Sequence, residues 1–137
     1  MSTLLKLGTG EEIPDPSPEQ VERALRSLRG GDGSVAILQR SDAVFMQVAG
    51  GGDEGFEVLE YSQGVPELHF QCLDGLETER VVQAFLKYRE GRNDHEREFR
   101  WKPLKRTIFP GFDKVIKFAT LAIIAGLVWF FMRIVLR

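Results

Sequence analysis

The residues best suited to metal chemistry lie in one short stretch near the middle of the chain. Glu67, His69 and Cys72 are residue types that bind metals, but all three lie in a segment that is expected to form a single strand. Glu67 and His69 would then share one face of a strand, while Cys72 points to the other. The pattern favours a solvated strand face with a buried thiol, so we predict no metal site and no cofactor.

Three other short motifs that could carry chemistry give no strong sign of catalysis. Gly50-Gly51-Gly52 lacks the Lys-Ser/Thr of a phosphate-binding loop and precedes an expected strand, so it is typical of a hairpin turn. Glu57 and Glu60 lie on opposite faces of a regular strand and form no carboxylate pair. Asp94-His95-Glu96 has no apolar neighbours and is expected to be a solvated loop. Two histidines and one cysteine would allow a Ser-His-Asp or Cys-His site, but no spacing positions one, and we predict that the chain is not an enzyme.

Charge is divided unevenly along the chain. Residues 1–99 contain ten Lys or Arg and nineteen Asp or Glu, a net charge of −9, whereas residues 100–137 contain eight Lys or Arg and one acidic residue, a net charge of +7. An acidic N-terminal part disfavours nucleic acid as a partner, because phosphate contacts need clustered Lys and Arg. The single cysteine excludes an intrachain disulfide and fits a reducing compartment. Residues 1–13 lack the pattern of a secretory signal, so none is expected there.

The C-terminal segment has the composition of a membrane-spanning helix. Residues 118–132 carry no charge, and residues 115–136 would form a helix of about 33 Å, enough to cross a hydrocarbon core of about 30 Å. A buried core helix is disfavoured because so small a domain could not cover it on every side, and an interfacial helix would need a polar face. We predict a single transmembrane helix over residues 115–136, preceded by a basic linker over residues 103–114.

Basic residues gather before this predicted span. The positive-inside tendency therefore places the N-terminal domain in the cytoplasm, in a tail-anchored topology of the bacterial inner membrane. The residues expected to contact anionic lipid headgroups are Lys102, Lys105, Arg106, Lys114, Lys117 and Arg133. Ala119, Ala122 and Gly126 would allow close helix packing, so a homo-oligomer formed through the span is a further hypothesis.

Residues 1–102 have the pattern of a small acidic α+β head domain. One helix is expected to begin at Pro18, with Ser17 as its N-cap, and a second to follow Gly75. Leu68 and Phe70 are expected on the covered face of a strand. The expected strands are residues 3–7, 35–40, 44–49, 56–61, 67–73 and 97–101. We therefore predict an antiparallel sheet of about five to six strands with two helices packed on one face.

A series of short motifs in this domain follows a familiar order. The motifs are Pro16-Ser17, Ala24-Leu25 with Leu28, Phe45-Met46-Gln47, Leu59-Glu60-Tyr61 with Gly64, Glu67-Leu68-His69-Phe70, Val81-Val82-Gln83-Ala84-Phe85 with Tyr88 and Gly91, and Phe99-Arg100-Trp101. With them, residues 3–102 resemble the family of small bacterial immunity proteins, found beside polymorphic toxins, that is numbered first in that nomenclature. The resemblance implies an α+β domain that binds a cognate toxin rather than catalysing a reaction. The C-terminal span is an addition to that family's pattern, as in a domain recruited as an adaptor by a defence system.

These observations favour a membrane-anchored protein-binding module, either immunity-like or an adaptor subunit, at the cytoplasmic face of the membrane. Its partner would be a toxin or a subunit of a membrane complex. The candidate partner-binding residues are Glu57, Glu60, Glu67, His69 and Trp101. An alternative is an oligomerising effector whose clustered spans perturb the bilayer, and an enzyme is a third hypothesis.

Overall fold

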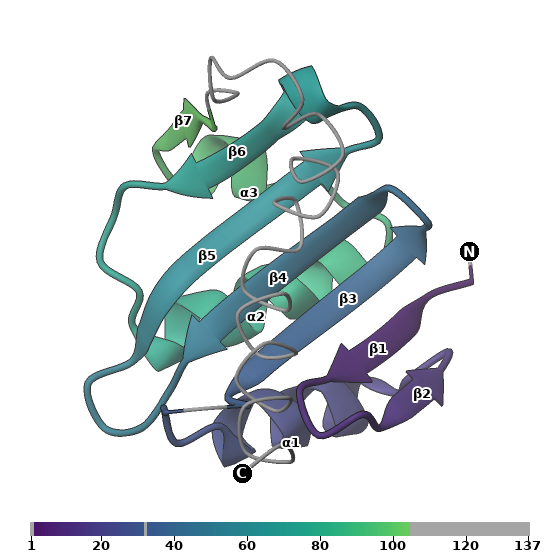
Figure 1. The fold of residues 1–137 in the computed structure, drawn as a ribbon, viewed down its shortest axis with the longest axis vertical. Helices are drawn as coiled ribbons and strands as arrows, with labels where there is room; N and C mark the ends of the chain where they lie inside the picture. The colour runs from purple at the N-terminus through teal and green to yellow at the C-terminus, as the bar shows by residue number, and fades with distance from the viewer. Residues whose placement is uncertain (1, 32, 105–137) are drawn as a thin grey trace, which may run out of the picture.

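The computed structural model describes residues 2–31 and 33–104 of the chain. Its elements are β1 (Leu4–Leu7), β2 (Glu12–Pro14), α1 (Pro18–Ser27), β3 (Val35–Ser41), β4 (Val44–Gly50), β5 (Phe56–Gln63), the 3-10 helix η1 (Pro66–Leu68), β6 (His69–Cys72), α2 (Thr78–Arg89), α3 (His95–Glu98) and β7 (Trp101–Pro103). The strands form one antiparallel sheet in the order β2-β1-β3-β4-β5-β6-β7, and the α-helices lie behind it in the view of Figure 1. The predicted α+β class, with an antiparallel sheet and helices on one face, is confirmed.

Helix α1 begins where its capping residues predict. The Ser17 hydroxyl accepts a hydrogen bond from the Gln20 N–H at 3.1 Å, and the Gln20 side chain accepts one from the Ser17 N–H at 2.8 Å. This reciprocal pair is a capping box, which satisfies backbone donors that the first helical turn leaves without partners. Pro18 follows at the first helical position, where its missing N–H costs nothing.

The turn between β4 and β5 is built by the glycine run, as expected for a hairpin. Gly51 has φ +124° and forms an isolated antiparallel bridge with Arg29, just beyond α1. A Cβ atom at Gly51 would overlap the backbone carbonyl of Leu28. Glycine is therefore required here both for the positive φ and for the close approach of the helix end to the turn.

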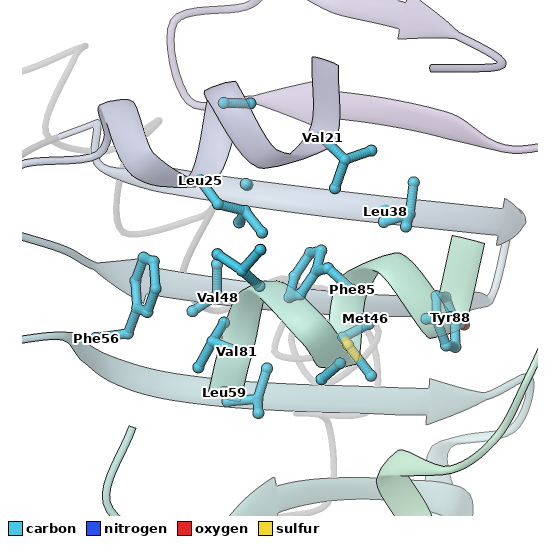
Figure 2. Close-up of a cluster of buried hydrophobic side chains, with 14 of the residues drawn as sticks. Val21, Leu25, Leu38, Met46, Val48, Phe56, Leu59, Val81, Phe85 and Tyr88 are labelled. Carbon is cyan, nitrogen blue, oxygen red and sulfur yellow. The ribbon is translucent and has the colours of Figure 1, made fainter. Parts of the chain in front are cut away.

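The core lies between the sheet and its two longer helices (Figure 2). The labelled side chains come from α1 (Val21, Leu25), from α2 (Val81, Phe85, Tyr88) and from the strands (Leu38, Met46, Val48, Phe56, Leu59). Each large apolar side chain that is fully buried here contributes about 1.5–3 kcal/mol. This packing assigns one face of the sheet to the helices and leaves the opposite face without any helix of the described part.

The described sheet has seven strands rather than the predicted five to six. The addition is β2, which pairs with β1 through Leu5 and Ile13. No strand is among those predicted for this region, which carries Pro14, Pro16 and Pro18. Proline is compatible with an edge strand, where its missing N–H can face solvent, and β2 lies at the edge of the sheet.

Residues 66–68 form a 3-10 turn before β6, so the predicted strand over residues 67–73 is shorter than expected. Leu68 was expected on the covered face, which is wrong, because its side chain is 39% exposed. Phe70 and Cys72 do pack against the helix-side core. The turn shifts Leu68 and Glu67 out of the strand's alternation, and β6 begins only at His69.

The prediction of a solvated loop at residues 94–96 is also wrong. Residues 95–98 form the short helix α3, and His95 is buried among aromatic rings. The predicted strand over residues 97–101 is displaced, because the last strand begins at Trp101 and pairs with β6 through Cys72. Three α-helices therefore occur in the described part, against the two predicted for the head.

The longest helix within residues 2–31 and 33–104 is α2, with twelve residues, and none there is long and apolar enough to cross a bilayer. The predicted span over residues 115–136 lies outside the described residues. So do all the predicted headgroup contacts except Lys102, and the small residues Ala119, Ala122 and Gly126. Lys102 is exposed on β7.

Candidate functional site

The helix-free face of the sheet carries a row of polar side chains across its centre. Residues paired between antiparallel strands project to the same face. The register pairs Ile37 with Gln47, Gln47 with Glu60, and Glu60 with Gln71. A parallel row pairs Phe45 with Ser62 and Ser62 with His69. Backbone pairing thus brings an amide, a carboxylate and an imidazole from β4, β5 and β6 close together.

Gln47, Glu60 and His69 form a buried polar cluster, with 0%, 5% and 2% of their surfaces exposed. The Gln47 Nε2 donates a hydrogen bond to Glu60 Oε2 at 2.8 Å. His69 Nε2 lies 3.6 Å from the other carboxylate oxygen, Glu60 Oε1, which is ion-pair distance if the ring is protonated. Burying a carboxylate is costly unless it is paired, so the contacts with Gln47 and His69 offset the cost of burying Glu60.

Apolar side chains flank this cluster on the same face. Val35, Ile37 and Phe45 form a small hydrophobic cluster, separate from the core, with Ala49 packed against it. The Phe45 ring meets the His69 ring edge-on at 5.9 Å between centroids. We call Val35, Ile37, Phe45, Gln47, Glu60 and His69 the helix-free face. It joins an apolar part on β3 and β4 to a polar part on β4, β5 and β6.

Two of the five predicted partner-binding residues, Glu60 and His69, meet on this face. Of the other three, Glu57 is exposed on β5, Glu67 is exposed in η1, and Trp101 is half-buried among the rings on the helix side. The expectation that His69 lies on a solvated strand face is wrong, because only 2% of it is exposed. Gln47 was missed as a site residue, since an isolated glutamine in a strand gives no signal of its partners.

A second polar group is buried on the helix side. His95 packs edge-on against the rings of Tyr61, Tyr88 and Trp101, at centroid distances of 4.5, 5.5 and 6.0 Å. Neither of its ring nitrogens has a hydrogen-bond partner in the described part of the chain. Burial lowers the pKa of His95 to about 4, with the nearby Arg40 adding to the effect. His95 is therefore neutral at pH 7 and packs as an aromatic ring.

The groups around His95 serve to hold α3 and β7 on the domain. The Trp101 indole donates a hydrogen bond to the His95 carbonyl at 2.8 Å. The Arg40 guanidinium lies 3.6 Å above the Tyr88 ring and donates to the carbonyls of Tyr88 and Arg92. Burial also raises the pKa of Tyr61 and of Tyr88 to about 12, so both phenols keep their protons. The arrangement is structural, since His95, Tyr61 and Tyr88 stay neutral and the Arg40 guanidinium is held by backbone carbonyls.

A shallow polar hollow of about 430 Å³ lies beside the start of the chain. Its polar groups are used internally: the Asp15 carboxylate accepts from the Thr3 N–H at 3.0 Å, and Arg89 Nε donates to the Pro16 carbonyl at 2.5 Å. The hollow thus presents groups that tie the N-terminal segment to α2. It is a weaker candidate than the helix-free face, whose buried carboxylate has only the Gln47 amide and His69 as described polar neighbours.

Over residues 2–31 and 33–104, no three His, Cys, Asp or Glu side chains are grouped so that they could hold a metal ion. Cys72 points toward the helix-side core, away from His69, as the strand alternation predicts. Burial raises the pKa of the Cys72 thiol, which disfavours the nucleophilic thiolate. Cys72 is therefore not arranged as a nucleophile in the described part of the chain.

Comparison of this chain with protein-family models, with curated proteins and with solved structures gives no match.

Proposed function

We propose that this chain is a membrane-anchored protein-binding module, immunity-like or an adaptor subunit, that acts at the cytoplasmic face of a membrane. The observation that carries the proposal is the helix-free face, where apolar side chains adjoin a buried amide, carboxylate and imidazole. Specific protein interfaces combine an apolar centre with a few polar groups that fix orientation. The partner would be a toxin or a subunit of a membrane complex.

The membrane anchor in this proposal is the apolar segment of residues 115–136. Its length suits a bilayer, and the basic residues before it favour an orientation with the N-terminal domain in the cytoplasm. Lys102, exposed at the end of the described part, would lie at the start of the basic linker that contacts anionic lipid. Anchoring concentrates the domain near partners in the same membrane.

The binding function is tested by capture of partners with the detergent-solubilised full-length chain from the cells that encode it. Glu60→Gln removes the carboxylate charge from the helix-free face, and Glu57→Gln removes an exposed carboxylate on the same strand. Loss of a desolvated charge at an interface lowers affinity by about tenfold or more. We expect Glu60→Gln to lose the protein that the wild-type chain retains, and Glu57→Gln to keep it. Equal capture by both variants would place the binding surface elsewhere.

The anchor is tested separately by sedimentation of a cell lysate. We expect the full-length chain in the membrane pellet, where high salt and alkaline carbonate leave it and detergent releases it. Recovery in the supernatant without detergent would contradict the proposed anchor, whatever the capture experiment gives.

The alternative function is an oligomerising effector, favoured by the small side chains Ala122 and Gly126 one helical turn apart. Ala122→Leu and Gly126→Leu would then abolish leakage of dye from vesicles, whereas Ile124→Leu would preserve it. Absence of leakage with the wild-type chain would exclude the effector function.

A further inference from the structure

The last elements of the described chain are too short to be stable by themselves. Helix α3 has four residues, and β7 has three and pairs with β6 at the edge of the described sheet. An isolated helix shorter than about 12 residues is marginal in water. Figure 1 shows both elements at the same end of the sheet, beside β6. Residues 93–104, which we call the α3–β7 segment, therefore depend on tertiary contacts for their order.

The His95 ring lies at the centre of these contacts. It packs edge-on against Tyr61 of β5 and Tyr88 of α2. It also meets the ring of Trp101 on β7, whose indole donates a hydrogen bond to the His95 carbonyl. The Trp101 ring in turn lies 5.8 Å from the ring of Phe99, between centroids. One imidazole thus joins the segment to both a helix and the sheet, and its displacement would break all of these contacts together.

The charged and titratable groups around His95 leave a protonated ring without an acceptor. Both ring nitrogens lack a hydrogen-bond partner in the described part of the chain. The groups concerned are Asp94, Glu96, Arg97 and Glu98 on or beside α3, Lys87 and Tyr88 on α2, Tyr61 on β5 and Arg40 on β3. Each of the three carboxylates already has a described partner, and both phenols keep their protons. From β7 the ring is faced by the Trp101 indole, which does not titrate.

A proton on His95 is therefore strongly unfavourable while the ring stays in place, because it would create a buried charge without a partner. We propose that residues 93–104 open as one local unit when His95 gains a proton, while α1, α2 and strands β1 to β6 stay folded. Opening takes the imidazolium into water and removes β7 from β6. The outer edge of β6, which pairs with β7 through Gln71 and Cys72, would then present free backbone groups to another extended chain.

The expected size of the effect follows from the environment of the ring. Burial is the main cause that lowers the pKa of His95 from 6.5 to about 4. In the open segment the ring is in water and binds a proton with its ordinary pKa. Below pH 6.5 each unit of pH therefore favours opening by up to about tenfold, so the opening constant should rise about a hundredfold between pH 7 and pH 4. The closed form keeps its full advantage above pH 6.5.

The test is amide hydrogen exchange of the full-length chain in detergent micelles, followed by mass spectrometry and corrected for the chemical exchange rate at each pH. Peptides from residues 93–104 report on the segment, and peptides from residues 44–63 report on β4 and β5. We expect protection of the segment to fall about a hundredfold from pH 7 to pH 4 and to stay at least about tenfold below that of the sheet. Urea at about 1 M should leave the protection of the segment unchanged, because a local opening exposes little surface.

Two substitutions locate the titrating group. His95→Phe keeps an aromatic ring and removes the proton, so protection of the segment should become nearly independent of pH. His95→Leu takes its place if circular dichroism shows that His95→Phe is unfolded. The chain has two histidines, and His69→Gln is the matched control, which should keep the fall in protection.

Three results would overturn the proposal. Equal protection of the segment and of the sheet at every pH would show that the segment opens only when the whole domain unfolds. A fall in protection that persists in His95→Phe would assign the proton to another group. Constant protection of the wild-type segment from pH 7 to pH 4 would show that the domain holds the imidazolium in place.

Discussion

Acidification should destabilise the domain through His95. The ring is 3% exposed and lacks hydrogen-bond partners at both nitrogens within the described chain. Burial is the main cause that lowers its pKa from 6.5 to about 4, and the positive charge of Arg40 acts in the same direction. The carboxylates of Asp94 and Glu98 oppose the shift but do not cancel it. The folded domain therefore resists protonation of a group that the unfolded chain protonates readily.

The sign and size of the effect follow from this difference. Between pH 6.5 and pH 4 the unfolded chain binds a proton at His95 and the folded domain does not, so the free energy of unfolding falls as the pH falls through this window. The stabilisation is fully present above pH 6.5. A shift from 6.5 to about 4, at about 1.36 kcal/mol for each pKa unit, amounts to a loss of about 3 kcal/mol by pH 4. This is a large share of the roughly 5–15 kcal/mol that stabilises a typical domain.

The assay is urea unfolding of the full-length chain, followed by circular dichroism at a series of pH values from 7 to 4. His95→Phe keeps an aromatic ring among aromatic neighbours and removes the titration. Other acidic and histidine groups are common to both chains, so the difference between their pH profiles isolates His95. We expect the wild type to lose about 3 kcal/mol more than the variant between pH 7 and pH 4. Parallel profiles would mean that His95 is already solvated, and the assigned packing of α3 would be wrong.

Three further features of the local structure are tested by substitution and urea unfolding. Gly51→Ala should lower the free energy of unfolding by about 2 kcal/mol or more, because the residue has a positive φ and the added Cβ overlaps the Leu28 carbonyl. Gly10→Ala is the control, since Gly10 also has a positive φ but has open space around it, and should cost about 1 kcal/mol. Equal losses in the two variants would contradict the close approach of Gly51 to Leu28. Ser17→Ala should cost about 1 kcal/mol by removing the capping box, and no loss would show that the cap is dispensable. Arg40→Lys should cost about 2 kcal/mol, because lysine cannot reproduce the fork of hydrogen bonds to two backbone carbonyls, and an unchanged stability would show that charge alone matters there.

The helix cap, the glycine turn and the positions of the central strands depend on residues close together in the chain, and these could be predicted from the sequence. Ser17 and Gln20 are three residues apart, and their reciprocal bonds need only the first turn of a helix to form. The glycine run at 50–52 determines a turn, because other residues rarely adopt its backbone angles. The strands expected over residues 35–40, 44–49 and 56–61 lie close to the observed bounds of β3, β4 and β5. The class of the fold was therefore available before any long-range contact was known.

Contacts between remote segments depended on the tertiary structure. His95 stands between two acidic residues and resembles a solvated position, but α2, β5 and β7 bring Tyr88, Tyr61 and Trp101 around it. Glu60 and His69 meet because the antiparallel register pairs Ser62 with His69. The 3-10 helix η1 delays the start of β6, so Glu67 lies in η1 and not in the strand. Residue type and spacing determine local angles and periodicity. Strand register and the packing of distant side chains are selected by the free energy of the whole domain, which no short stretch of sequence contains.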